Sequence, residues 1–190
     1  MDANSFEKIE VKNRAELWEW FERNHTQEAS IWLVTWKRHW EDRYLSREAV
    51  LDAVIAYGWI DERRMVLDKH RTMQLLSRRR QQAWAQTYIN RANRLIEEGK
   101  MKASGIASIE GAKSSGKYRS LAHVDDLIEP ASLISALERY NAKDWWHAAA
   151  PSYRRNVLRW VASGKKEVTK ENRVEVIAEH ASKGKKVPQY

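Results

Sequence analysis

The chain contains no cysteine among its 190 residues, which excludes a disulfide framework, a thiolate nucleophile and a cysteine-based metal site. No stretch approaches 18 consecutive apolar residues, so the sequence predicts no hydrophobic membrane span. The first ten residues lack a basic region followed by an apolar one, which is the pattern of a secretory signal. We therefore expect a soluble cytoplasmic protein.

Familiar catalytic and metal-binding motifs are also missing. The six histidines are scattered, without a His-x₃-His pair or an HExxH motif, so we predict no metal site and no cofactor. Residues 111–117 have the spacing of a phosphate-binding loop, but Tyr118 stands where that loop requires a hydroxyl residue. No G-x-S-x-G nucleophile elbow is present. We predict no catalytic residue, and these absences favour a protein that is not an enzyme.

The residues that are present describe a globular, basic protein. Apolar residues make up 43% of the chain and charged residues 32%. Ten tryptophans accompany only two phenylalanines, and because each indole N–H needs a partner we expect many of these rings to be partly buried. The formal net charge is +8, with +4 in residues 61–80 and +6 in residues 151–190. This excess favours anionic partners, although it also serves solubility.

Hydrophobic periodicity predicts alternating elements at the start of the chain. Residues 14–24 have the spacing of a helix with one buried face. Residues 29–37 are β-branched and aromatic, which is typical of a strand. Ser46 is a suitable N-cap for a helix over residues 47–58.

The next segments predict a β-hairpin and further helices. Residues 64–67 and 72–76 are typical of two short strands around a polar turn, in which Asp68 can bond its own backbone. Helical periodicity returns over residues 78–99, where the final glycine can end a helix. Residues 103–113 predict another short helix.

The remainder of the chain predicts a small helical unit. A connector rich in Ser, Gly and Asp covers residues 114–130. Pro151 can open a helix, and Thr169 can cap another. The predicted fold class is α+β, mostly α-helical with a small antiparallel sheet in the N-terminal part and a helical C-terminal module. We place the N-terminal unit at residues 1–120 and the C-terminal module at residues 128–187.

Charged and aromatic residues gather around the predicted hairpin. If Arg63 and Arg71 flank the turn on paired strands, their guanidiniums could clamp a carboxylate or a phosphate. Trp59 would then offer a stacking surface, and Asp61 and His70 could also converge there. The alternative is an Asp–Arg pair that satisfies itself on the rim of the sheet.

A second basic run, Arg78–Arg80, begins the predicted helix over residues 78–99. Because positive charges at a helix start oppose the helix dipole, these arginines do not serve local stability. They either reach acids elsewhere or meet an external anion. The candidate anion-binding residues are Trp59, Asp61, Arg63, Arg71, Arg78, Arg79 and Trp84, and no metal ligand is among them.

The order of these segments resembles the YdeI/OmpD-associated family, also described as bacteriocin-protection proteins. The similar residues are Trp20 to His25, Trp32–Leu33, Gly58 to Asp61, Arg78 with Trp84, Arg94 to Gly99, and Met101. The resemblance runs from about residue 14 to about residue 187, although Ser77 stands where relatives usually carry proline. It implies tolerance of bacteriocins or antimicrobial peptides, a link to outer-membrane porins and a mostly helical fold with a small antiparallel sheet, with no defined reaction or cofactor.

Three functions therefore stay open. The first is a non-enzymatic bacterial stress or envelope-tolerance protein that binds a protein partner or an anionic ligand through the basic surface between Trp59 and Arg80. The second is a nucleic-acid-binding protein, whose affinity would fall steeply with salt. The third is an enzyme acting on a small anionic substrate, with Asp61 as the base and Arg63 or Arg71 as the clamp.

Overall fold

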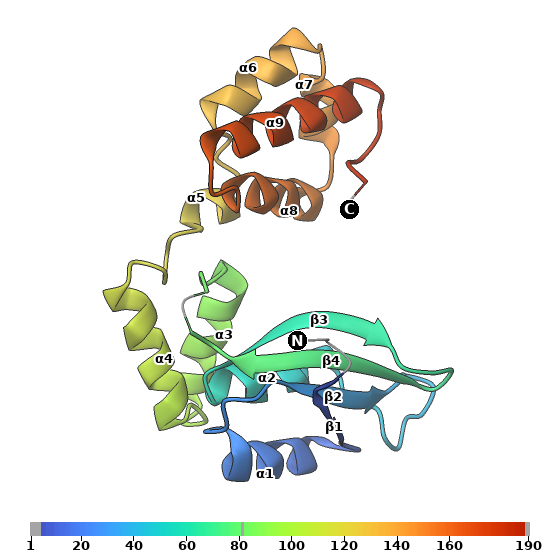
Figure 1. Cartoon of the computed structure of the whole chain (residues 1–190), viewed down its shortest axis with the longest axis vertical. Coiled ribbons are helices and arrows are strands. Elements are labelled where there is room, and N and C mark those ends of the chain that lie inside the picture. Colours follow the sequence, from blue (N-terminus) through green and yellow to red (C-terminus); the bar gives the residue numbers. More distant parts are fainter. Residues whose placement is uncertain (1–4, 81, 189–190) are drawn as a thin grey trace. The chain divides into compact units, whose positions relative to one another are not determined.

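The computed structural model describes residues 5–80 and 82–188. The chain divides into two compact units, residues 1–119 and residues 120–190 (Figure 1). The first unit combines helices with a sheet and the second is helical, so the predicted α+β class is confirmed. Within the described residues, no helix is both long enough and apolar enough to cross a membrane.

The first unit is built on a four-stranded sheet with the strand order β1-β2-β4-β3. The strands are β1 (Glu7–Glu10), β2 (Ile31–Trp36), β3 (Trp59–Val66) and β4 (Arg71–Arg78). Strand β4 pairs antiparallel with β3, as the predicted hairpin requires, and also antiparallel with β2, whereas β1 pairs in parallel with β2. The sheet is therefore mixed rather than wholly antiparallel. The sequence did not indicate β1, because Ile9 is the only apolar side chain in that short strand.

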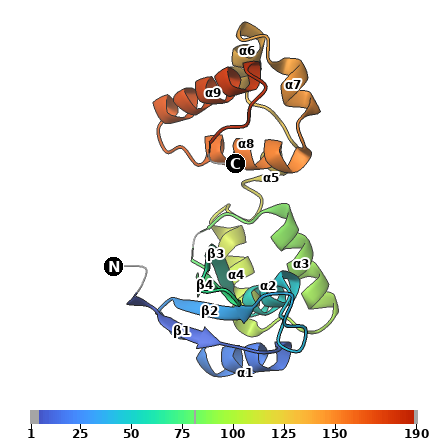
Figure 2. The same ribbon diagram turned by 90° about the vertical axis from the view of Figure 1, so that its right-hand side faces the viewer.

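Both faces of the sheet bury apolar side chains. Successive residues of a strand point to opposite faces, so Ile31 and Leu33 face one side and Trp32 and Val34 the other, and all four are buried. The first pair packs against the helices of this unit, which lie on one side of the sheet (Figure 2). These helices are α1 (Arg14–Asn24), α2 (Arg47–Ala56), α3 (Gln86–Glu97) and α4 (Ala103–Ser114). Trp32 and Val34 belong to a smaller cluster on the opposite face.

Helix α2 lies at the centre of the larger core. The predicted N-cap is confirmed, because Ser46 Oγ accepts a hydrogen bond from a backbone N–H of the first turn at 3.1 Å. The residues from Val50 to Ala56 are buried in succession, so this part of the helix is enclosed on every side. Asp52 is the charged residue in this run, and its carboxylate forms ion pairs of 2.5 Å with both Arg91 and Arg94.

Two glycines let α4 lie directly against the junction of α2 and β3. Gly58 has a φ of +72°, and a Cβ atom there would lie 2.6 Å from the carbonyl oxygen of Ser104. A Cβ atom on Gly105 would lie 2.3 Å from the carbonyl oxygen of Ala56. Because both contacts are with backbone atoms, neither position has room for a side chain.

The predicted hairpin is confirmed as β3 and β4. One carboxylate oxygen of Asp68 accepts the backbone N–H groups of His70 and Arg71 at 2.8 and 2.7 Å, which is the local turn that the sequence indicated. The pairing register shifts between Asp61 and Arg64, so β3 carries a bulge near its start.

The predicted start of a helix at Arg78 is wrong. Arg78 belongs to β4, where it pairs with Trp59, and α3 begins only at Gln86. Pairing with β3 therefore overrides the helical periodicity of this segment. Arg78 is the last residue of β4, and Arg79 and Arg80 follow it directly. Neither a helix dipole nor the free amides of a first helical turn therefore acts on these arginines. Helix α3 ends close to Gly99, as predicted.

The second unit is a helical module with its own core. Its helices are α5 (Ala122–Asp125), α6 (Ala131–Arg139), α7 (Lys143–Ala148), α8 (Pro151–Ala162) and α9 (Glu167–Ser182). Trp146 is fully buried in this core, while its neighbour Trp145 packs at the edge. Burial alone would raise the pKa of Glu129, but hydrogen bonds from Trp146 and Arg154, at 2.6 and 2.7 Å, hold that pKa below its usual value.

One detail of this unit differs from the sequence-based expectation. Helix α9 begins at Glu167, so Thr169 lies inside the helix and does not cap it. Beyond α9, Val187 is 1% exposed, and its backbone N–H donates to the hydroxyl of Tyr153 at 3.1 Å. The chain therefore docks onto the module again after its last helix. Pro151 opens α8, as predicted.

Candidate functional site

Two of the predicted site residues, Trp59 and Trp84, are buried in the core of the first unit. Trp59 is 0% exposed, and its indole N–H donates to the backbone carbonyl of His25 at 2.8 Å. Trp84 is 1% exposed, and the guanidinium carbon of Arg79 lies 4.3 Å from its ring centroid. Neither ring offers a face on which a ligand could stack from solvent. Trp84 instead supports a buried arginine.

The carboxylate of Asp61 is occupied by neighbouring side chains. One oxygen accepts a hydrogen bond from the hydroxyl of Tyr88, and the other accepts from the amide of Gln74 at 3.1 Å. Arg47 lies 3.7 Å from the second oxygen. Burial, together with the hydrogen bond to Asp61, raises the pKa of Tyr88, so its hydroxyl stays protonated and donates at neutral pH. Asp61 thus pairs with an arginine that comes from α2 and not from the hairpin.

Arg63 and Arg71 do not form the predicted clamp. Arg71, at the start of β4, pairs with Glu10 at 2.6 Å and with Asp68 at 2.7 Å. Seven residue steps along the extended strand, on the order of 23 Å, separate it from Arg78 at the other end of β4. Arg63 is exposed at the bulge of β3. The hairpin arginines are therefore distributed along the strands.

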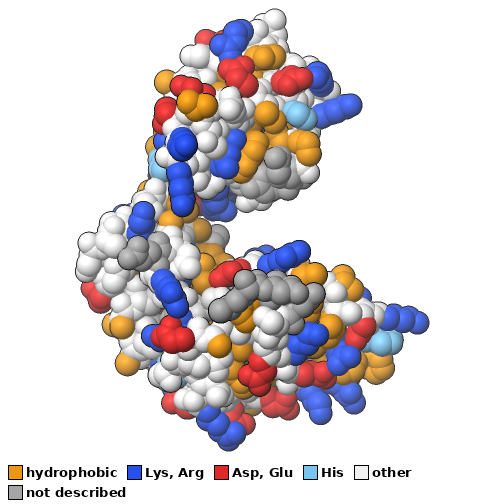
Figure 3. Space-filling view, in the orientation of Figure 1, with side chains coloured by type: hydrophobic (Ala, Val, Ile, Leu, Met, Phe, Trp, Pro, Cys, Tyr) orange, Lys and Arg blue, Asp and Glu red, His pale blue; other side chains and the backbone are white. Residues whose placement is uncertain are grey.

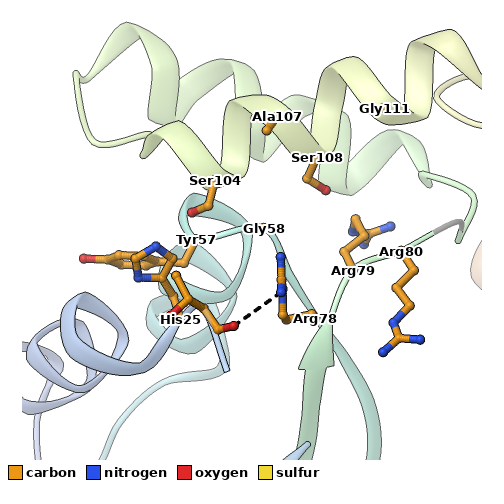
Figure 4. A pocket seen from close by; sticks show the side chains of 11 residues that line it. His25, Tyr57, Gly58, Arg78, Arg79, Arg80, Ser104, Ala107, Ser108 and Gly111 are labelled. Carbon is orange, nitrogen blue, oxygen red and sulfur yellow. Dashed lines mark hydrogen bonds between the residues drawn. The ribbon is translucent and has the colours of Figure 1, made fainter. Parts of the chain in front are cut away.

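The structure does bring Arg78 and Arg79 together, at a pocket of about 300 Å³ in the first unit. Four parts of the chain bound this pocket: the end of α1, the junction of α2 and β3, the end of β4, and α4 (Figure 4). Arg78 donates to the carbonyl of Thr26 at 3.3 Å and forms an ion pair with Glu28. The side chain of Arg80 turns away from α4 and lies 3.1 Å from Glu28.

Arg79 is the buried arginine of this pocket, with 8% of its surface exposed. Its Nη1 atom donates to the carbonyls of Gln82 and Ala83 at 3.5 and 3.4 Å. Its Nε and Nη2 atoms, which share one edge of the guanidinium, are buried and have no hydrogen-bond partner in the described part of the chain. The guanidinium carbon also lies 5.3 Å from the ring centroid of Tyr88, so two aromatic faces hold it in place.

The free edge of Arg79 carries a charge that lacks a direct counterion. Burial lowers the pKa of Arg79 to about 10, while the nearby Tyr88 and Asp61 oppose this shift. The guanidinium is therefore protonated at neutral pH. A buried donor without an acceptor typically costs about 1–3 kcal/mol, and more when it is charged. An anion that accepts hydrogen bonds from this edge would remove this cost.

Helix α4 presents two hydroxyl groups to the same pocket. The Oγ atoms of Ser104 and Ser108 are buried, and neither has a hydrogen-bond partner within residues 5–80 and 82–188. Figure 4 shows both side chains on the side of α4 that faces Gly58 and the end of β4. Ala107 and Gly111 line the pocket from the same helix, and their small size leaves space between α4 and the arginines.

Sequence reasoning did not select Ser104 and Ser108. Both lie in a segment that was correctly predicted to be a helix, and their i, i+4 spacing was the available signal. Their placement opposite Arg79 depends on the close approach of α4 to Gly58, which is a tertiary contact. His25, from the end of α1, also lines the pocket and was not selected.

The chemistry of the pocket is that of a hydrogen-bond donor set with positive charge. Among the described residues, no group of three or more His, Cys, Asp or Glu side chains is placed to hold a metal ion. Guanidinium edges and hydroxyl groups are the usual protein partners of carboxylates and phosphates. The arrangement therefore suits an anionic group.

Comparison with known families assigns the two units separately. A family model described as "Domain of unknown function (DUF8412)" matches residues 9–108, and one described as "Bacteriocin-protection, YdeI or OmpD-Associated" matches residues 126–184. The expected resemblance is thus confirmed for the C-terminal module, whereas the hairpin and most of the pocket lie within the other match. Searches of curated proteins and of solved structures found no significant match. The chain therefore belongs to the family described as a domain of unknown function (DUF8412), and its C-terminal unit carries a YdeI/OmpD-associated domain.

Proposed function

We propose that the protein is a non-enzymatic binding protein that captures an anionic group in the pocket between β4 and α4. The observation that carries this proposal is the Nε–Nη2 edge of Arg79, which is buried and charged, has no partner among the described residues and belongs to a side chain that lines the pocket. Natural proteins seldom leave such an edge unpaired, because the desolvation penalty is not repaid. Functional sites are the places where this penalty is tolerated.

Of the residues predicted from sequence, Arg78 and Arg79 form the site in this proposal. The rings of Trp84 and Tyr88 pack against the guanidinium of Arg79. Asp61 holds the hydroxyl of Tyr88 by a hydrogen bond and so contributes indirectly. The description of the C-terminal domain supports a role in tolerance of bacteriocins or antimicrobial peptides. In this role the first unit would bind the anionic ligand or the anionic surface of a protein partner.

Replacement of Arg79 by methionine tests the proposal. The change keeps an unbranched side chain beside Trp84 but removes the charge and the donor edge. We expect titration of the wild type with inorganic phosphate and with citrate to shift the amide NMR signals of Gly58 and Ser108. In Arg79→Met the affinity should fall at least about tenfold, because a hydrogen bond to a charged group is worth about 1.5–3 kcal/mol.

Arg63→Met is the matched control, because it removes an exposed arginine of the same unit outside the pocket. It should bind like the wild type. If Arg63→Met and Arg79→Met weaken binding equally, the effect reflects net charge and the pocket is not the site. In bacteria exposed to a cationic antimicrobial peptide, expression of the wild type or of Arg63→Met should raise survival, and Arg79→Met should not.

A further inference from the structure

The donors of the pocket point from more than one direction. Nε and Nη2 of Arg79 form a fork whose two N–H groups are parallel, since they lie on one edge of a planar guanidinium. Such a fork binds two oxygens of one group side by side. A carboxylate has two oxygens in one plane, so this fork alone would satisfy it.

The two hydroxyls of α4 go beyond what a carboxylate needs. Ser104 and Ser108 approach from the helix that covers the pocket, whereas Arg79 reaches it from the end of β4 (Figure 4). Both hydroxyl oxygens are buried without a partner among the described residues. A third oxygen outside the plane of the first two would accept from them. A tetrahedral oxyanion has such an oxygen.

The local charge distinguishes among tetrahedral anions. Three arginines, Arg78, Arg79 and Arg80, line the pocket, and the carboxylate of Glu28 pairs with Arg78 and Arg80. Two positive charges are left. A phosphate monoester carries about −1.5 to −2 at pH 7, whereas a sulfate ester or a carboxylate carries one negative charge. The phosphate monoester therefore matches the charge as well as the shape.

The size of the pocket limits the rest of the ligand. About 300 Å³ is at the lower end of the range for small-molecule pockets. Its helix-borne lining is small, with Ala107 and Gly111 on α4, and Gly58 opposite cannot carry a side chain. The lining includes no aliphatic side chain larger than alanine, so it favours a compact, polar ligand.

We propose that this pocket binds the phosphoryl group of a small phosphate monoester, held by the Nε–Nη2 fork of Arg79 and by the hydroxyls of Ser104 and Ser108. This inference rests on the proposed function and names its ligand class. Arg79 binds two phosphoryl oxygens, and the serines bind the third. Arg78 balances the second negative charge.

Three small probes test this ligand class on the full chain: methyl phosphate, methyl sulfate and acetate. Titrations at a pH of about 7.5 keep the phosphate in its dianionic form, because its second pKa is near 6. We expect methyl phosphate to bind the wild type at least about tenfold more tightly than either monoanion, with the same amide signals shifting. Methyl sulfate has the tetrahedral shape of methyl phosphate but one negative charge, so it tests the effect of charge. Acetate is planar, so it tests the effect of shape.

The double variant Ser104→Ala/Ser108→Ala isolates the contribution of the hydroxyls. The affinity of this variant for methyl phosphate should be roughly tenfold or more lower than that of the wild type. Its affinity for acetate should change little, because acetate needs only the arginine fork. Ser114→Ala is the matched control, since Ser114 lies on the same helix with an exposed hydroxyl that donates to the carbonyl of Glu110. Circular dichroism and the melting temperature verify that each variant is folded.

The possible outcomes separate the two proposals. If no anion binds the wild type, both the anion site and its phosphoryl ligand are wrong. If acetate binds as tightly as methyl phosphate, or if the double variant weakens both equally, the anion site stands and the phosphoryl assignment is overturned. Selective loss of methyl phosphate in the double variant supports the assignment.

Discussion

Two buried charged residues of the first unit contrast sharply in how they are satisfied. Asp52 is 6% exposed and forms ion pairs with Arg91 and Arg94, so its charge is compensated within the fold. Arg79 is buried to a similar degree, but one edge of its guanidinium has no partner among the described residues. Such compensation of Asp52 is expected of a charge that serves the structure alone. The open edge of Arg79 is the feature on which the proposed anion site rests.

Asp68 allows a prediction of pH dependence at the residue scale. A side-chain hydrogen bond from Arg71, together with the backbone N–H of His70, lowers the pKa of Asp68 to about 2. Because the pKa is lower in the folded than in the unfolded state, the carboxylate stabilises the fold above pH ~4 and loses this effect as the pH falls toward 2. Asp68→Asn should therefore be less stable than the wild type at pH 7, and the two should converge in acid.

Urea denaturation of both proteins between neutral pH and about pH 2.5 measures this difference. Asparagine keeps an oxygen that can accept the turn N–H groups, so the comparison isolates the charge. Asp42→Asn is the control, because Asp42 is an exposed residue that pairs only with its neighbour Arg43 at 3.1 Å in the described structure. A constant gap between wild type and Asp68→Asn at every pH would contradict the prediction.

At the scale of elements, α4 matters because of where it packs. Its serines reach the pocket only because Gly105 and Gly58 bring the helix against the junction of α2 and β3. The arginines reach it because β4 extends to Arg78 before the chain turns toward α3. A strand end and a helix face thus meet to form one donor set.

A pair of glycine substitutions within α4 tests this packing. Gly105→Ala places a Cβ atom 2.3 Å from a backbone oxygen, so we expect a loss of about 1–3 kcal/mol in the free energy of unfolding. Gly111→Ala meets no atom within 4 Å and should gain up to about 1 kcal/mol from helix propensity. Urea denaturation measures both. Equal changes in the free energy of unfolding for the two variants would show that α4 does not pack closely against the junction of α2 and β3.

At the scale of the whole molecule, charge is less concentrated than composition suggests. On the face seen in Figure 3, Lys and Arg side chains are interspersed with Asp and Glu. Many arginines are also paired, including Arg71, Arg78, Arg94 and Arg159. The formal charge of +8 therefore does not by itself describe a surface for nucleic acid.

The two units should be independently stable. Separate clusters of buried side chains lie within residues 1–119 and within residues 120–190. We expect each fragment, expressed alone, to unfold cooperatively in urea, with a larger m-value for the first because it is longer. A fragment without a cooperative transition would show that its core needs the other unit.

The local elements of this fold were largely predictable. The cap at Ser46, the Asp68 turn and the helix opened by Pro151 all follow from hydrogen bonds and backbone preferences within a few residues. The helix predicted to start at Arg78 was not found there, because pairing with the distant Trp59 outweighs local periodicity. The parallel edge strand β1 escaped prediction because it has a single apolar side chain and pairs with β2, which lies more than 20 residues away in the sequence.

The sequence also identified Arg78 and Arg79 as candidates, but it could not separate them from Arg63 and Arg71. All four are arginines near one hairpin, and residue type alone does not show which of them meets solvent. The burial of Arg79 arises from residues that follow it in the chain and from α4, which closes over the end of β4. Only tertiary packing therefore decides which arginine keeps a free edge, because desolvation depends on every segment that surrounds a charge.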